Sequence, residues 1–249
     1  MTISSKENEK LKLVRKLAER KHREREGLFV TEGEDLLQAG LAAGLEPSLV
    51  LSREGAELEG DEVAAELLDA ASQLGSGTRV IAVWPLSGTL RPSGAPIGAP
   101  HGRVDREGAL CVYLHGVGDP GNVGSIVRSA AALGASSVVL GPGCADAYGP
   151  KAIRASMGAI FAVDVSPGEF ESTPAPRVSL VAHNGAAEAP SRVRTLCLGS
   201  EREGLPAEIA DACDATWTIP TREGVESLGV AAAAAIALSR IGSPTEERA

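Results

Sequence analysis

Apolar positions recur at helical and strand spacings along the first third of the chain. A basic helix is predicted from about residue 10, and its apolar stripe comprises Leu11, then Leu13 or Val14, then Leu17 or Ala18. Short apolar runs predict strands at residues 28–31, 47–52 and 79–84, and helical spacing predicts helices at residues 34–43 and 61–72. Together these elements indicate a small α/β unit.

A regular alternation of strands and helices follows from residue 110. Strands are predicted at residues 110–114, 137–140, 160–165, 178–182, 195–198 and 216–219, and helices at residues 123–133, 151–157, 207–213 and 225–240. The strands are almost continuously apolar, which is typical of a parallel sheet that helices cover on both faces. Ligands bind such sheets at the carboxyl ends of the strands.

Residues 85–108 separate these two patterns. They hold four Pro and five Gly and show almost no apolar periodicity. We therefore expect an α/β protein with an N-terminal domain at residues 1–84, a linker at 85–108 and a second domain at 109–249. The hydrophobic content of 43% is sufficient for a core in each domain.

Charge is distributed unevenly along the chain. The net charge of -9 argues against a nucleic-acid partner, but residues 10–25 contain eight Lys or Arg and only two Glu. A local basic cluster on an acidic protein can still bind RNA phosphates. The candidate RNA contacts are Arg15, Lys16, Arg20, Lys21, Arg23, Arg25 and Arg154. Arg154 lies among apolar residues, and an internal ion pair is the alternative to a phosphate.

The remaining composition excludes several classes of site. The four cysteines form no CxxC pair, so we expect reduced, buried thiols, and the four scattered histidines indicate no metal site. There is no apolar run of roughly 18 residues and no N-terminal signal core. We expect a cytoplasmic protein with no membrane segment.

Three glycine-containing segments carry the candidate chemistry. They read DPGNVGSIVRSAAALGA from Asp119, LGSEREGLP from Leu198 and IPTREGVESLGVAAAAAIAL from Ile219, and each joins a strand end to a helix. Asn122 is either a site residue or a helix N-cap. Arg128 is either a surface residue or a cation that reaches back over the small Gly124 and Ser125 toward the helix start.

The second and third segments add two more candidates. Glu201 follows a strand that ends at Gly199, where a ligand could approach the backbone closely. A carboxylate in such a loop is often only solvated, but its place at a strand's carboxyl end favours a site. Ser227 enters an Ala-rich helix and is either a site residue or a helix cap.

In combination, residues 109–240 resemble the SpoU/TrmH family of RNA 2′-O-methyltransferases. Residues 20–44 (RKHREREGLFVTEGEDLLQAGLAAG) resemble the ribosomal-protein-like, RNA-binding substrate domain that is often fused to them. The resemblance implies a deep trefoil knot, a homodimer with a shared site, and methyl transfer from S-adenosylmethionine (SAM) to a ribose 2′-hydroxyl of rRNA or tRNA. It implies that Asn122, Arg128, Glu201 and Ser227 are catalytic, and that SAM is bound by Ala182, His183, Gly199, Ile219 and Leu228.

One departure from the family keeps an alternative open. The third motif of the family usually reads Ser-Leu-Asn, whereas Gly229 follows Ser227 and Leu228 here. A non-catalytic RNA-binding protein on the same scaffold is therefore the second hypothesis. A nucleotide-binding oxidoreductase is the third, but the dinucleotide fingerprint is broken where Asp119 and Pro120 interrupt GVGDPGNVG.

Overall fold

The chain folds into two compact units, in a computed structural model that describes residues 2–75, 77–86, 109–222 and 228–242. One unit comprises Met1–Ile97 with Tyr148–Phe161, and the other comprises Gly98–Ala147 with Ala162–Ala249. The segment Tyr148–Phe161 therefore packs with the N-terminal part of the chain. Most of the predicted linker lies outside the described residues, so the domain boundaries stay a prediction.

The first unit is built on a four-stranded mixed sheet in the order β1-β4-β2-β3. The strands are β1 (Leu28–Glu32), β2 (Leu49–Arg53), β3 (Asp61–Val63) and β4 (Val80–Pro85). The helices are α1 (Glu9–Lys16), α2 (Arg20–Glu26), α3 (Glu34–Ala42), α4 (Ala65–Ala71) and α6 (Pro150–Ser156). Leu11, Val14 and Leu17 are buried in its core, as their helical spacing predicts.

Two predictions for this unit need correction. The basic helix is in fact two helices, because α1 ends at Leu17 and α2 begins at Arg20. The helix predicted at residues 61–72 begins as strand β3, which pairs with β2, and only then becomes α4. Val63 is fully buried in this pairing, so burial in the sheet decides the conformation of a segment with little pattern of its own.

Aromatic contacts fix the segment Tyr148–Phe161 in the first unit. The ring of Phe161 lies 4.9 Å from that of Trp84, and the ring of Tyr148 lies 5.0 Å from that of Phe29. The strand predicted at residues 160–165 is wrong in its first half, because Ala159–Phe161 form a 3-10 turn. Strand β7 begins only at Asp164.

The second unit has a six-stranded, entirely parallel sheet in the order β10-β8-β9-β5-β6-β7. Its strands are β5 (Leu110–Leu114), β6 (Ala135–Leu140), β7 (Asp164–Pro167), β8 (Arg177–Val181), β9 (Thr195–Leu198) and β10 (Ala215–Thr218). Its helices are α5 (Pro120–Ala132), α7 (Ala207–Asp211) and α8 (Val230–Gly242). The predicted α/β class and parallel sheet are thus confirmed.

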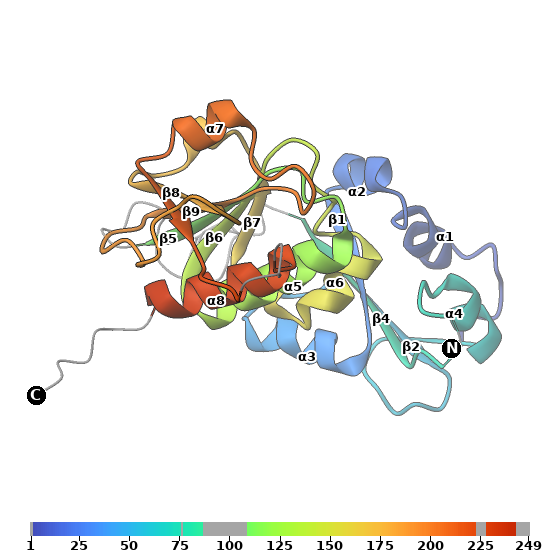
Figure 1. Cartoon of the computed structure of the whole chain (residues 1–249). Helices are drawn as coiled ribbons and strands as arrows, with labels where there is room; N and C mark the ends of the chain where they lie inside the picture. The colour runs from blue at the N-terminus through green and yellow to red at the C-terminus, as the bar shows by residue number, and fades with distance from the viewer. Residues whose placement is uncertain (1, 76, 87–108, 223–227, 243–249) are drawn as a thin grey trace, which may run out of the picture. The chain divides into compact units, whose positions relative to one another are not determined.

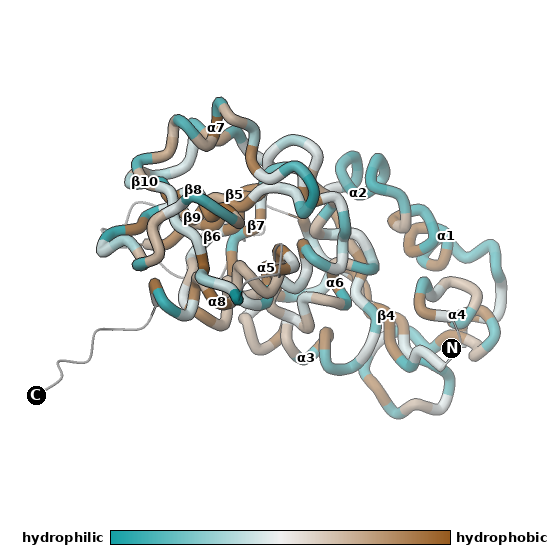
Figure 2. The backbone as a smooth tube through the Cα atoms, in the orientation of Figure 1, coloured by the Kyte–Doolittle hydropathy of each residue, from teal (hydrophilic) through white to brown (hydrophobic). Residues whose placement is uncertain are grey.

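Helices α5 and α8 run side by side and pack against each other (Figure 1). Strand β5 is buried over its whole length, and Figure 2 shows the apolar character of the central strands. Each central strand has a neighbour on both sides, so the loops at their carboxyl ends gather along one edge of the sheet.

A half-buried carboxyl at the opposite end of this sheet predicts a pH effect. Asp164 begins β7 beside Ser137, and burial raises the pKa of its carboxyl from 3.8 to about 6. The folded state therefore holds this proton more tightly than the unfolded state, and stability falls as pH rises from the lower value to the higher. Asp164→Asn is expected to stabilise the protein at pH 7.5 by about 1 kcal/mol, after allowance for partial exposure.

This gain should disappear at pH values below the unfolded pKa of about 3.9, where both states are protonated. Urea unfolding at the two pH values measures it, with Asp211→Asn on the exposed face of α7 as the matched control. A variant that is no more stable than the parent at pH 7.5 would contradict the assignment.

Candidate active site

The loops that follow β8, β9 and β10 enclose a cavity of about 420 Å³ together with the start of α8. All five residues predicted to bind the cofactor line it: Ala182, His183, Gly199, Ile219 and Leu228. The sequence motifs are far apart along the chain, and the carboxyl edge of the parallel sheet brings them together.

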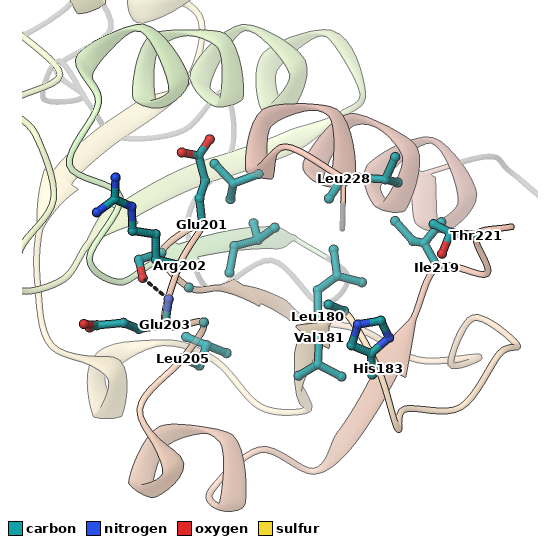
Figure 3. A pocket seen from close by; sticks show the side chains of 17 residues that line it. Leu180, Val181, His183, Glu201, Arg202, Glu203, Leu205, Ile219, Thr221 and Leu228 are labelled. Carbon is teal, nitrogen blue, oxygen red and sulfur yellow. Dashed lines mark hydrogen bonds between the residues drawn. The ribbon is translucent and has the colours of Figure 1, made fainter. Parts of the chain in front are cut away.

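The cavity has two chemically different sides. Figure 3 shows Glu201 and Arg202 on one side, and Ile219, Thr221 and Leu228 on the other. Further apolar side chains from the sheet and from α8 line the cavity, namely Leu180, Val181, Leu198, Leu205, Val230 and Ala233. Such a cavity suits a ligand with a flat apolar part and a positive charge.

Gly199 is required by the way the loop after β9 folds back on itself. A Cβ on Gly199 would lie 2.0 Å from the carbonyl carbon of Gly204 and 2.1 Å from the nitrogen of Leu205. Ser200 and Gly204 exchange two backbone hydrogen bonds of 3.1 and 3.0 Å that close this turn. The expected close approach to Gly199 is thus made by the chain itself, and it shapes one wall of the cavity.

The helix cap at α5 differs from the simple interpretation of the sequence. Asp119 is the N-cap, and its Oδ1 accepts a hydrogen bond of 2.9 Å from the backbone nitrogen of Asn122. The interpretation of Asn122 as a mere N-cap is therefore wrong. Its side-chain amide is free to donate a hydrogen bond of 2.6 Å to Oε1 of Glu201.

Two of the four predicted catalytic residues, Asn122 and Glu201, are therefore joined by a hydrogen bond. Arg128 is exposed on α5 and forms no hydrogen bond or ion pair with the residues that the structure describes. The expected approach of Arg128 to Asn122 is not seen within one chain. Ser227 lies outside the described residues.

The predicted RNA-binding cations of α1 and α2 are mostly exposed but locally compensated. Figure 2 shows the hydrophilic character of α2. Most of the candidate cations bond a nearby carboxylate: Lys16 pairs with Glu26, Arg20 with Glu24, Lys21 with Glu19 and Arg25 with Glu26, at 2.7 to 3.1 Å. Arg15 instead donates to the carbonyl oxygens of Lys6 and Leu11. Phosphates would have to compete with these contacts, each of which is worth little at a surface.

Arg23 does not belong to this surface, which corrects the prediction for it. Its side chain is buried with only 4% of the residue exposed. One guanidinium nitrogen donates to the carbonyl oxygens of Leu17 and Ala18, at 2.7 Å each. It thereby satisfies carbonyls at the end of α1, which is a structural role.

Arg154, by contrast, is exposed on α6. It forms no ion pair with any residue in the described part of the chain, so the alternative of an internal ion pair is not supported. Its side chain remains available for a phosphate.

Some site residues were missed by reasoning from the sequence. Thr221, Val230 and Ala233 also line the cavity, and nothing in their local pattern distinguishes them. The capping role of Asp119 was detectable, because an aspartate followed by Pro120 at the first helical position is a helix-start signal.

The described residues show no metal cluster, no disulfide and no membrane-spanning helix. None of their His, Cys, Asp and Glu side chains form a cluster that could hold a metal ion, and all four cysteines are free thiols. Within these residues, no helix has both the length and the apolar character that crossing a membrane requires.

Comparison with known proteins identifies the family of this chain. The profile of the SpoU rRNA Methylase family matches residues 109–239, and that of the MRM3-like substrate binding domain matches residues 8–84. The 23S rRNA (guanosine(2553)-2′-O)-methyltransferase RlmP of Bacillus subtilis is 27% identical, over 94% of this chain and 96% of its own. An uncharacterized tRNA/rRNA methyltransferase of Mycobacterium tuberculosis is 31% identical, over 84% of this chain and 79% of its own.

Solved structures give the same result. The SpoU methyltransferase AviRb from Streptomyces viridochromogenes, in complex with the cofactor AdoMet, has a TM-score of 0.77 and 25% identity, covering 94% of this chain and 97% of that chain. The fold and the site thus define an RNA-methylating enzyme of the parallel α/β class. The chain belongs to the SpoU rRNA methylase family. The expectations of an enzyme, of SAM as cofactor and of RNA ribose methylation are confirmed at the level of the family.

Proposed function

We propose that this chain transfers a methyl group from SAM to a ribose 2′-hydroxyl of rRNA, in the cavity at the ends of β8, β9 and β10. The observation that carries this proposal is the hydrogen bond between Asn122 and Glu201 at the side of that cavity. This bond links the first motif, which contains Asn122, to the second motif, which lines the cavity together with the third. The relatives named as 23S rRNA methyltransferases favour rRNA over tRNA.

The cavity fits SAM by its chemistry. Apolar side chains such as Leu205, Ile219 and Leu228 suit an adenine ring, and backbone groups of the turn after Gly199 are available for its polar edge. The carboxylate of Glu201 favours a sulfonium charge. When bound, SAM supplies an electrophilic methyl group, so the protein needs no metal for this reaction.

The residues of the chain would position the hydroxyl and stabilise the charge that forms on it. A guanidinium keeps its proton at physiological pH and is a poor base, so Arg128 would hold the RNA phosphate and stabilise the forming alkoxide. Asn122 and Glu201 would orient Arg128, and Ser227 would help to position the substrate. Methyl transfer also requires that the ribose hydroxyl oxygen lies in line with the bond between the methyl carbon and the sulfur of SAM.

A homodimer explains the isolation of Arg128. This arginine has no polar partner within the described part of its own chain, while the Glu201 carboxylate is exposed and can accept further hydrogen bonds. The Arg128 of one protomer would meet the Asn122–Glu201 pair of the other. We also propose that the segments around the cavity form a trefoil knot, and that the protein acts in the cytoplasm, where rRNA is available.

The first unit would deliver the RNA. The match to a substrate binding domain supports this role, and the ribosomal-protein-like character is part of the proposal. The proposed contacts are the half-buried Lys16 and the exposed cations Arg15, Arg20, Lys21, Arg25 and Arg154. RNA affinity should fall steeply with salt, since phosphate contacts release counterions.

The direct test is transfer of radiolabelled methyl from SAM to RNA, with rRNA and tRNA fractions separated. Label in the rRNA fraction is the expected result. Label in tRNA alone would overturn the substrate class. Absence of label from both, with SAM binding present by calorimetry, would instead support the non-catalytic RNA-binding protein.

Gly229 makes that alternative testable in the protein itself. A Cβ on Gly229 would meet no described atom within 4 Å, and the carbonyl of Gly229 accepts from Ala233 at the start of α8. Gly229→Asn should therefore fold normally, with a stability change within about 0.5 kcal/mol. Because the amide restores hydrogen bonds that glycine lacks, we expect kcat for RNA methylation to rise severalfold.

Gly229→Ala is the matched control, since it adds the Cβ without the amide. Equal activity of the two variants in the methyl-transfer assay would show that the asparagine side chain adds nothing to this site.

A further inference from the structure

A second hollow lies beside the cofactor cavity at the carboxyl edge of the same sheet. Its volume is about 490 Å³, and it is lined by His115, Gly116, Pro142, Gly143, Ser200, Glu203, Gly204 and Pro206. Ser200, Glu203 and Gly204 line both hollows, so the turn at residues 200–204 forms a shared wall. The loops after β5 and β6 and Pro206 before α7 supply the remaining lining residues.

The proposed function requires a binding site for the acceptor nucleotide on the other side of this shared wall. The reacting oxygen must lie about 3–3.5 Å from the methyl carbon, so the acceptor nucleotide has to bind directly beside the cofactor. A second hollow across one turn from the cofactor cavity is the space that its base can enter. RNA targets are commonly read with the base splayed out of its stack.

The floor of this second hollow is formed by backbone. Gly116 and Gly143 have positive φ angles of 68° and 76°, and a Cβ on Gly143 would lie 3.1 Å from the Cα of Gly116. Side chains at these positions would be strained and crowded. The two ionisable side chains of the lining, His115 and Glu203, are therefore left to contact whatever enters.

The protonation of His115 can be assigned from its neighbour. The Tyr113 hydroxyl lies 3.3 Å from Nδ1 of His115, and Tyr113 is only 1% exposed. Burial raises the pKa of Tyr113 to about 12, so the phenol keeps its proton. Nδ1 is the hydrogen-bond partner that the described residues give this phenol, so Tyr113 donates to it. A neutral His115 then carries its own proton on Nε2 and is a donor there.

Glu203 supplies the complementary acceptor. Its backbone nitrogen bonds Ser200 Oγ at 3.1 Å, which fixes the turn, and Figure 3 shows its carboxylate directed away from the apolar residues of the cofactor cavity. The side chain is exposed, and a carboxylate can accept two parallel hydrogen bonds. The hollow thus presents one donor and one double acceptor.

We propose that the second hollow holds the base of the target nucleotide and selects guanine, with His115 Nε2 donating to O6 and Glu203 accepting from N1–H and the 2-amino group. Guanine offers one acceptor beside two neighbouring donors on its Watson–Crick edge. Uracil offers a single donor between two acceptors, and adenine and cytosine place one amino donor beside a ring-nitrogen acceptor. Guanine is the base whose Watson–Crick edge can pair with both the His115 donor and the two acceptor oxygens of Glu203. This inference rests on the proposed methyl transfer.

The first experiment identifies the methylated nucleoside. Unmodified rRNA transcripts are incubated with the full chain and SAM, digested to nucleosides and analysed by mass spectrometry. The expected product is 2′-O-methylguanosine. Another 2′-O-methyl nucleoside overturns the inference but leaves the proposed function intact, whereas absence of any methylated nucleoside removes both.

The second experiment tests Glu203 against a single group of the base. Replacing the target guanosine by inosine removes only the 2-amino group, and the parent enzyme is expected to lose about tenfold in kcat/KM. Glu203→Gln should lose about tenfold on guanosine and most of the discrimination against inosine. Glu208→Gln, an exposed residue of α7, is the matched control and should discriminate as the parent does.

Measurements of SAM affinity separate the two hollows. If Glu203→Gln discriminates against inosine as strongly as the parent, or weakens only SAM binding, Glu203 does not read the base and the inference fails. His115→Ala provides an independent check. It should lower kcat/KM for guanosine RNA by about tenfold with the SAM dissociation constant unchanged, and an unchanged kcat/KM would exclude the histidine.

Discussion

Replacing Arg128 with alanine is expected to lower methyl transfer by about 10²–10³-fold, the usual cost of removing a group that stabilises charge in a transition state. The fold should not change. Arg128 is exposed and makes no polar contact with the described residues of its chain, so the free energy of unfolding should stay within about 0.5 kcal/mol. Initial rates of methyl transfer and urea unfolding measure the two quantities.

Arg192→Ala is the matched control, because Arg192 is equally exposed but lines neither hollow. It should keep full activity. A fully active Arg128→Ala variant would remove the role that we give this residue.

The dimer hypothesis predicts a second result for Arg128→Ala, when it is mixed with a variant of Glu201. Glu201→Gln should also be nearly inactive, since it removes the negative charge beside Asn122 that would hold Arg128. If Arg128 acts across the interface, mixing the two inactive proteins restores part of the activity, because some sites combine an intact Arg128 with an intact Glu201. No recovery on mixing, with exchange of protomers demonstrated, would place both residues in the same protomer's site.

The other large effect is expected from Gly199→Ala. The added Cβ would lie 2.0 Å from the carbonyl carbon of Gly204, which is backbone and cannot rotate away. The turn at residues 200–204 must therefore move, and this turn is a wall of the cofactor cavity. We expect a loss of about 1–3 kcal/mol in stability and at least about 100-fold in SAM affinity.

Gly229→Ala is the appropriate control for this substitution. It adds the same methyl group to a residue near the same cavity, where no described atom lies within 4 Å. Calorimetric titration with SAM should then show affinity close to that of the parent. Normal SAM affinity in Gly199→Ala would mean that the turn is not part of the cofactor site.

How much of the fold could be predicted depended on how strongly each segment is patterned. Residues 110–114 and 195–198 were assigned correctly as strands, because continuous apolar runs in the centre of a sheet have few alternatives. Strand β3 was missed because it has three residues and one buried side chain, Val63. Pairing with β2, which is distant in sequence, decides its conformation.

The candidate site also has parts that the sequence motifs could predict and parts that depend on the path of the chain. The motifs could place Gly199 and Ile219 at strand ends and Leu228 at the start of the following helix, and the rule for parallel sheets then predicts that these segments meet. Periodicity contains no information about the bond from Asn122 to Glu201, because that bond depends on the path of the chain between them. The burial of Arg23 was equally hidden, since it follows from where α1 ends.

The assignment of Tyr148–Phe161 to the first unit has a consequence for assembly of the protein on the ribosome. The rings of Phe29 and Trp84 obtain their partners Tyr148 and Phe161 only from chain that is made after the start of the second unit. The aromatic contacts of the N-terminal module are therefore completed only after residue 161 has been synthesised, whereas its aliphatic core around Leu11, Leu51 and Ile81 is built from N-terminal residues alone. Exchange of this module between related enzymes must accordingly transfer two separate pieces of gene.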